Sequence, residues 1–211
     1  MTPERRARVE AVLATRQPDL TVLMERVHKP HNFSAVLRTA DAVGALEAHA
    51  VLAHGRMPEL SGTSRGAEKW VKVHTYPTTT SALEQLQQRG FRCYAAHFSE
   101  RARDFRTVDY TQPTAIILGT EYHGVSPEAL AQVDGEIIIP MIGMTQSLNV
   151  SVANSVILYE AQRQRELAGM YEQCRLDDES YQRLRFEWLY PRQAQLLREQ
   201  GEPYPPIEAL A

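Results

Sequence analysis

Residues 137–153 read IIIPMIGMTQSLNVSVA, and this segment decides how the rest of the chain is interpreted. An unbroken run of isoleucines before Pro140 is typical of a strand that is buried on both faces. Ser147 and Asn149 are good N-cap residues, so they predict that a helix begins after a loop. Such a strand-loop-helix turn offers free backbone N–H and C=O groups to a ligand. The segment contains neither the dinucleotide-binding motif nor the phosphate-loop motif, so neither motif explains it.

Apolar segments on both sides of this turn alternate between strand and helix periodicity. We expect strands at residues 21–27, 48–53, 70–76, 91–97, 114–118 and 137–139. We expect helices at residues 3–16, 33–43, 82–88, 127–132, 149–168 and 178–190, the second of them capped by Asn32. Strands that alternate with helices predict an α/β protein with a parallel sheet. On this basis residues 20–168 form the main domain, with helical extensions at residues 1–19 and 169–211.

The overall composition fits one large domain with additional segments at its ends. The chain has 211 residues, 43% of them hydrophobic, which is enough for a substantial core. We find no signal peptide and no apolar run of membrane-spanning length, so we expect no membrane partner. Cys93 and Cys174 are far apart and form no C-x-x-C motif, which favours a reduced, cytoplasmic location.

The distribution of charge is more informative than the net charge of −3. Residues 111–159 contain no Lys or Arg, whereas they contain four carboxylates. A segment without cations suits a cationic or neutral ligand better than a free phosphate. Arginines are instead frequent in the flanking regions, where local positive patches could hold a polyanion despite the net charge.

Three clusters of polar residues are candidates for a functional site, and each also has a purely structural explanation. Asn32 could be a helix cap, and Arg38 a solvated arginine on the same helix. Glu121 lies between Gly119 and Gly124 after a buried strand, where open α/β sheets bind ligands, but turns commonly hold such carboxylates. The third cluster is Ser147-Leu148-Asn149 in the segment quoted above. Helix capping alone would explain these residues, although capping is compatible with ligand contact.

Other chemistries fit less well. The chain has seven histidines, but His28-x-x-His31 has no cysteine partner and no H-E-x-x-H motif occurs, so we expect no metal site. Ser126 and Ser147 lie in no G-x-S-x-G motif, which argues against a serine hydrolase.

The three clusters resemble, in order and spacing, the three motifs of the SpoU/TrmH class of SPOUT methyltransferases. The matching residues are Asn32 with Arg38, Leu118-Gly119-Thr120-Glu121 with Gly124, and Ile139-Pro140-Met141 with Ser147-Leu148-Asn149-Val150-Ser151. Residues 16–23, 104–111 and 159–165 also resemble the branch of this class that methylates guanosine 18 of tRNA. The resemblance covers roughly residues 5–206.

The resemblance implies a Rossmann-like parallel sheet whose C-terminal third is threaded as a trefoil knot, in a protein that works as a homodimer. It implies S-adenosylmethionine as the cofactor and 2′-O-methylation of the guanosine 18 ribose, in the D-loop of tRNA, as the reaction. Knots are rare in proteins, so composition and periodicity alone would oppose this topology. Two rival functions remain open: 2′-O-methylation of another tRNA or ribosomal RNA ribose, and a non-catalytic RNA-binding dimer.

By position, the resemblance also implies two sets of site residues. Backbone groups would hold the cofactor around Ala96, Gly119, Ile139 and Leu148, with Ala96 replacing a threonine of close relatives. The catalytic set would comprise Arg38, Asn32, Glu121, Ser147 and Asn149. Arg38 could act as a general base, or as a cation that holds an RNA phosphate and orients the ribose, and the partner subunit could supply it.

Arginines in both flanking regions are candidates for RNA binding. The set consists of Arg5, Arg6, Arg8, Arg16, Arg163 and Arg165, with Arg183, Arg185 and Arg192 as further candidates. About half of them could be solvated helix residues that make no RNA contact. RNA binding that uses several of them should weaken steeply with salt.

Overall fold

The computed structural model describes residues 2–52, 66–120 and 123–207. The chain divides into two compact units. The larger unit is Pro18–Gly169, and the smaller unit joins Met1–Gln17 to Met170–Ala211. The two terminal segments, which the sequence suggests as separate extensions, therefore belong to one unit.

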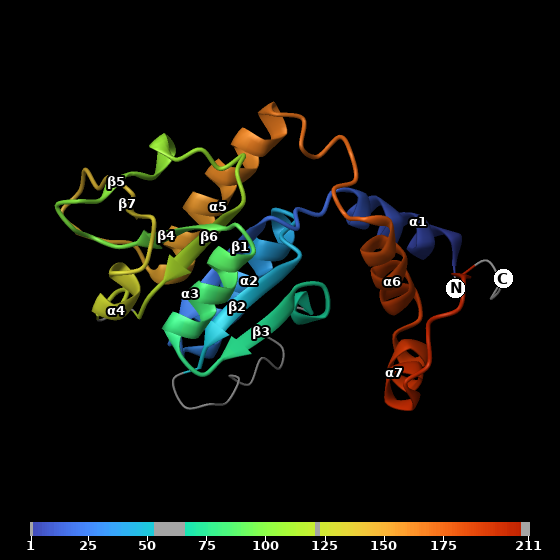
Figure 1. The fold of residues 1–211 in the computed structure, drawn as a ribbon. Helices are drawn as coiled ribbons and strands as arrows, with labels where there is room; N and C mark the ends of the chain where they lie inside the picture. The colour runs from blue at the N-terminus through green and yellow to red at the C-terminus, as the bar shows by residue number, and fades with distance from the viewer. Residues whose placement is uncertain (1, 53–65, 121–122, 208–211) are drawn as a thin grey trace. The chain divides into compact units, whose positions relative to one another are not determined.

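A parallel β-sheet forms the centre of the larger unit (Figure 1). In the described residues it has seven strands in the order β3-β2-β1-β6-β4-β7-β5, and every neighbouring pair is parallel. The strands are β1 (Leu20–Glu25), β2 (Glu47–Val51), β3 (Lys72–Tyr76), β4 (Arg92–Ala96), β5 (Arg103–Asp104), β6 (Thr114–Leu118) and β7 (Gly135–Ile138). The central strands β1 and β6 consist entirely of buried residues, because helices cover the sheet on both faces.

Helices pack on both faces of this sheet (Figure 1). They are α2 (Pro30–Ala42), α3 (Thr79–Gln88), α4 (Pro127–Leu130) and α5 (Val150–Leu167), with short 3-10 helices η1 (Ala67–Lys69) and η2 (Phe105–Thr107). α2 and α5 pack together on one face, and α3 and α4 pack together on the other. Side chains alternate along β1, so Val22 and Met24 join the core under α2 and α5, while Leu23 joins the core under α3 and α4.

Most expected elements are present, although their ends differ from the predictions. The strand predicted at 114–118 is confirmed as β6, whereas the last strand runs from Gly135 to Ile138. The prediction that Asn32 caps its helix is wrong, because α2 begins at Pro30 and its N-cap is Lys29. Proline is well suited to the first helical position, where its missing N–H needs no partner. The two-residue strand β5 was not predicted.

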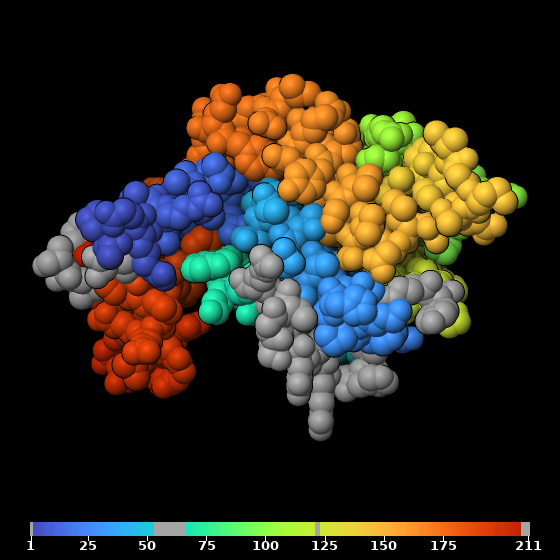
Figure 2. Space-filling view, turned by 180° about the vertical axis from the view of Figure 1, so that it is seen from behind, coloured from blue at the N-terminus to red at the C-terminus, as the bar shows by residue number. Residues whose placement is uncertain are grey.

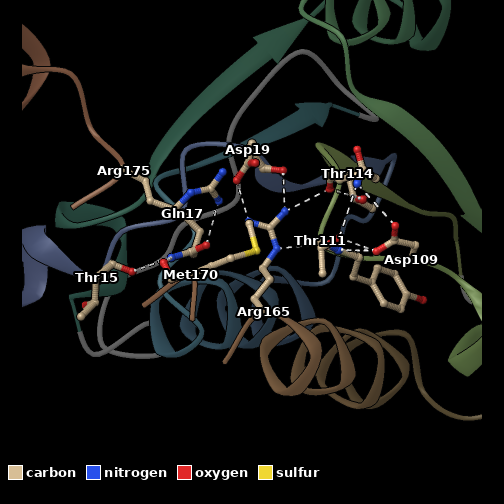
Figure 3. Close-up of polar contacts among 11 residues, drawn as sticks. Thr15, Gln17, Asp19, Asp109, Thr111, Thr114, Arg165, Met170 and Arg175 are labelled. Atoms are coloured by element: carbon tan, nitrogen blue, oxygen red, sulfur yellow. Dashed lines mark hydrogen bonds and ion pairs between the residues drawn. The ribbon is translucent and has the colours of Figure 1, made fainter. Parts of the chain in front are cut away.

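In its described part, the smaller unit consists of α1 (Pro3–Ala14), α6 (Asp178–Leu189) and α7 (Pro191–Gln200). α1 packs against α6, and an ion pair of 2.6 Å between Glu10 and Arg185 joins the two helices. The Gln17 side chain donates a hydrogen bond to the Met170 carbonyl at 2.9 Å (Figure 3). These contacts connect the two ends of the chain within this unit.

Arg165, near the end of α5, lies in the interior of the larger unit and has no exposed surface (Figure 3). Its guanidinium forms an ion pair of 2.6 Å with the Asp19 carboxylate. It also donates hydrogen bonds to the backbone carbonyls of Tyr110, Asp19 and Gln112 at 2.8, 3.1 and 3.1 Å. Arg165 therefore connects α5 to the segment before β1 and to the segment before β6.

Candidate functional site

A cavity of about 630 Å³ lies at the carboxyl ends of β4, β6 and β7. The carboxyl ends of parallel strands meet at one edge of the sheet, which is where open α/β sheets bind ligands. The lining in the described part of the chain comprises residues 96–98, 118–120, 123–124, 137–139 and 146–150, together with Lys29, Met141, Ala153 and Ile157. The volume falls within the roughly 300–1,000 Å³ of ordinary small-molecule sites.

One wall of this cavity is a tight turn, which we call the glycine turn: Gly119, Thr120, His123 and Gly124. Two backbone hydrogen bonds of 3.0 and 2.9 Å join Thr120 to Gly124. A Cβ atom on Gly119 would lie 2.0 Å from the backbone carbonyl of Gly124, so a side chain does not fit there. Gly124 has a φ of +65°, a conformation that other L-residues seldom adopt. The sequence therefore specifies this wall through two glycines.

Asn149 connects the first and third sequence clusters. Its side-chain oxygen accepts a hydrogen bond from the backbone N–H of Ser151 at 2.9 Å and so caps α5, as the sequence predicts. Its side-chain nitrogen donates to the side-chain oxygen of Asn32 at 3.3 Å, and Asn32 is buried. Capping alone therefore does not account for Asn149, because the residue also joins the start of α5 to the first turn of α2.

The structure brings most of the predicted site residues to the cavity, but not all of them. The lining includes Ala96, Gly119, Ile139, Ser147, Leu148 and Asn149. Arg38 is exposed on α2, outside the described lining, and it forms no hydrogen bond or ion pair that involves the described residues. Glu121 lies outside the described residues. One chain thus provides the predicted cofactor positions without the predicted catalytic arginine.

Comparison with known proteins shows what kind of site this is. The SpoU rRNA methylase family matches residues 19–159, and the C-terminal family of SpoU rRNA methylases matches residues 163–210. The chain belongs to the SpoU rRNA methylase family. The α/β fold with a parallel sheet, which the sequence predicts, is confirmed as that of SpoU-type SPOUT methyltransferases.

Several SpoU relatives and solved structures are similar over most of the chain. The tRNA (guanosine(18)-2′-O)-methyltransferase of Thermus thermophilus is 59% identical over 188 residues, which cover 89% of this chain and 97% of the relative. The enzyme of the same name from Escherichia coli K12 is 53% identical over 209 residues, which cover 98% and 91%. The crystal structure of the A. aeolicus TrmH/SpoU tRNA modifying enzyme has a TM-score of 0.85 and 44% identity, and it covers 89% of this chain and 96% of that chain. The AdoMet-bound rRNA methyltransferase of Sinorhizobium meliloti has a TM-score of 0.63 and 27% identity, with coverages of 73% and 59%.

The charge of this SpoU-family cavity differs from the sequence-based expectation. Its described lining contains one lysine, no arginine and no carboxylate. The lysine is Lys29, the N-cap of α2, which lies outside the cation-free segment 111–159. The cavity is therefore not free of cations, because the start of α2 contributes to it. The sequence signal for Lys29 was the following Pro30, which places the lysine at a helix start.

Arg16 and Arg165 of the predicted RNA-binding set are buried instead, as is Arg185 among the further candidates. Arg165 has no exposed surface and is fully engaged with backbone carbonyls and a carboxylate. Arg16 is 1% exposed, and its guanidinium lies 5.1 Å from the centre of the Trp188 ring. Neither guanidinium is available to RNA while its unit is folded, so we remove both from the predicted RNA-binding set.

Among the described residues, no cluster of three potential metal ligands occurs. None of their helices has the length and apolar character needed to cross a membrane. Cys174 is an exposed free thiol, whereas burial, together with the nearby Asp134 carboxylate, raises the pKa of the Cys93 thiol to about 12.

Proposed function

We propose that this protein transfers a methyl group from S-adenosylmethionine to the ribose 2′-hydroxyl of guanosine 18 in tRNA. The cavity carries this proposal, because the second and third motifs form its walls and its lining includes all four predicted cofactor positions. The relatives that are 59% and 53% identical bear the name of this activity, which supports the same substrate. A solved SpoU-family neighbour is described as AdoMet-bound, which supports the same cofactor.

The cavity suits S-adenosylmethionine in its chemistry as well as in its volume. Leu118, Ile139 and Leu148 provide apolar walls for a flat purine ring, and the neighbouring strand ends offer backbone polar groups. Lys29 contributes a positive charge that suits the carboxylate of the ligand's methionine part. When bound, the cofactor supplies a methyl group on a positively charged sulfur that becomes neutral after transfer.

Arg38 is proposed to orient the RNA rather than to remove a proton. Guanidinium groups remain protonated in proteins. Arg38 is exposed on α2, where a phosphate can reach it. As a cation it can bind an RNA phosphate through two parallel hydrogen bonds. The ribose next to that phosphate would then be held in place, and a weak nucleophile such as a hydroxyl gains much from a fixed geometry.

A homodimer would complete the site, with Arg38 of each chain acting at the cavity of the other. In support, Arg38 lies outside the described lining of the cavity in its own chain. Ile142 and Met144 are fully exposed in the loop before α5, and Val152 and Tyr159 of α5 are about half exposed. Figure 2 shows the face on which α5 and this loop, in orange and gold, lie beside α2, in blue. Exposed apolar residues on one loop and the helix that follows it suit an interaction surface.

The smaller unit is proposed to bind tRNA. Arg5 and Arg8 are exposed on α1. Arg6 on α1, and Arg163 on α5 of the larger unit, form ion pairs with carboxylates on their own helices, so phosphate contacts would have to replace those pairs. Because tRNA is the proposed substrate, we place the protein in the cytoplasm.

Three further features stay predictions from the family resemblance. The C-terminal third of the larger unit is expected to form a trefoil knot. Glu121, which lies outside the described residues, is expected to support Arg38. The larger unit is proposed as the methyltransferase domain, with the sequence-predicted extensions at residues 1–19 and 169–211 as additions to it.

The proposal is tested by methyl transfer from labelled S-adenosylmethionine to an unmodified tRNA transcript, with mapping of the modified nucleoside. We expect 2′-O-methylguanosine at position 18 with the wild type. We expect no transfer with Arg38→Ala, and near-normal transfer with the control Arg92→Ala, which alters an exposed arginine at the amino end of β4, away from the cavity. Mixing Arg38→Ala with a variant that cannot bind the cofactor should restore part of the activity if the two chains share each site.

Ribosomal RNA is a second candidate substrate, and similarity to one relative supports it. The 23S rRNA (guanosine-2′-O-)-methyltransferase RlmB of Ralstonia nicotianae is 36% identical over 155 residues, although these cover only 61% of that relative. Transfer to ribosomal RNA, with none to tRNA, would favour this alternative. Cofactor binding without transfer to either RNA would favour the non-catalytic RNA-binding dimer.

A further inference from the structure

Glu25 is a buried carboxylate at the carboxyl end of β1 that the site described so far does not use. It is 3% exposed, and it does not belong to the described lining of the cavity. Among the described residues, no lysine or arginine pairs with it. A buried carboxylate without a cation is costly unless hydrogen bonds satisfy both of its oxygens.

Three neutral donors satisfy the two oxygens of Glu25. The backbone N–H of Ser126 donates to Oε2 at 2.8 Å, and the hydroxyl of the same serine donates to Oε1 at 2.6 Å. The hydroxyl of Thr79, at the start of α3, also donates to Oε1 at 2.6 Å. Ser126 in turn caps α4, because its Oγ accepts a hydrogen bond from the backbone N–H of Ala129 at 3.2 Å. One carboxylate thus fixes both the backbone and the side chain of Ser126.

The position of Ser126 matters because it follows Gly124, the last residue of the glycine turn, by two residues. The chain enters the turn from β6, where Leu118 pairs with Met24 of β1. It leaves the turn towards Ser126, which the carboxylate of the next β1 residue holds. Two consecutive residues of β1 therefore fix both ends of the turn, one through strand pairing and the other through its side chain.

We propose that Glu25 is a positioning residue that sets cofactor affinity by holding the glycine turn in place without touching the ligand. Binding sites depend on a supporting shell that keeps their walls within about 0.5 Å of the productive geometry. The glycine turn has no side chain at Gly119 or Gly124 with which to pack, so its position depends on its two ends. This inference rests on the proposed function in one respect, which is that S-adenosylmethionine occupies the cavity.

The test measures the Kd of S-adenosylhomocysteine by calorimetry for the full-length folded protein and its variants. Glu25→Ala should raise the Kd about tenfold, which corresponds to roughly 1.4 kcal/mol. Glu25→Gln keeps an acceptor for the Ser126 N–H and should raise it about threefold, as should Ser126→Ala, because each keeps part of the hydrogen bonding. The matched control is Glu47→Gln, which alters a largely buried carboxylate at the opposite end of the neighbouring strand β2 and should change the Kd less than about twofold.

A double-variant cycle separates positioning from general destabilisation. If the carboxylate acts through Ser126, Ser126→Ala should add little to the Kd of Glu25→Ala. If Glu25→Ala does not fold, Ser126→Ala and Glu25→Gln decide the question. Folded variants that bind with wild-type Kd would overturn this inference alone. Wild-type protein that binds S-adenosylhomocysteine but methylates no tRNA would leave this measurement valid and refute the proposed function, whereas wild-type protein that fails to bind would refute both.

Discussion

Replacing Arg165 by methionine tests whether this arginine stabilises the fold or binds RNA. The substitution removes the ion pair with Asp19 and leaves the carbonyls of Tyr110 and Gln112 without these donors. Removing one partner of a buried ion pair costs about 3–5 kcal/mol. For a protein of this size each kcal/mol lowers Tm by roughly 2–4 °C, so the expected fall in Tm is about 6–20 °C. Arg163→Met is the matched control, because Arg163 lies on the same helix with an exposed side chain.

The assay is thermal unfolding followed by circular dichroism, combined with tRNA binding at a temperature where all variants are folded. We expect Arg165→Met to lose stability and to bind tRNA with wild-type affinity. We expect Arg163→Met to keep its Tm within about 2 °C, because exposed ion pairs contribute little. If Arg165→Met kept the wild-type Tm and lost tRNA affinity, the structural assignment of this arginine would be wrong.

Three further outcomes are expected. Stability should fall as the pH drops from 4.5 towards 2. Burial raises the pKa of Glu47, but its basic neighbours more than offset this effect and hold the pKa at about 2, so the unfolded chain binds more protons than the folded chain in this range. Urea unfolding of Glu47→Gln should therefore depend less on pH below 4.5 than unfolding of the wild type. A thiol reagent should modify Cys174 in the native chain and Cys93 only after unfolding, which mass spectrometry can check, and rapid native labelling of Cys93 would contradict its burial. Gly119→Ala should bind S-adenosylhomocysteine at least about tenfold more weakly in calorimetry, because its Cβ would meet the Gly124 carbonyl, and unchanged binding would show that the turn can shift freely.

Elements with a local signal were predictable from the sequence. After its first residue, Thr114, β6 is a run of apolar residues that pairs with strands on both sides, so burial on both faces was visible in its composition. The start of α5 was predictable because Asn149 caps it through a bond to a residue only two positions away. The start of α2 was misplaced because two local signals competed, and Pro30 at the first helical position prevailed over Asn32 as a cap.

Features that depend on distant partners were not predictable. Arg165 was assigned to RNA because arginines on helices are usually exposed, yet its partners lie 53 to 146 positions away. Glu25 gave no functional signal for the same reason, since Ser126 is 101 positions further along the chain. The proposal that Ala96 and Ile139 contact the cofactor came from family resemblance, and periodicity alone indicated only that each lies at the end of a strand.

The pairing of α1 with α6 has a consequence for how the protein is made. α1 leaves the ribosome before the larger unit, and its apolar residues Val9 and Leu13 are buried within the smaller unit, which also needs the segment after Gly169. At about 5–20 residues per second, the partner helix at Asp178–Leu189 emerges roughly 9–35 seconds later. During that interval the growing chain exposes these two apolar side chains of an otherwise charged helix while the larger unit is being completed. Translation pauses or loss of the last helices would prolong that exposure, so chaperone dependence should rise when the chain is truncated after Gly169.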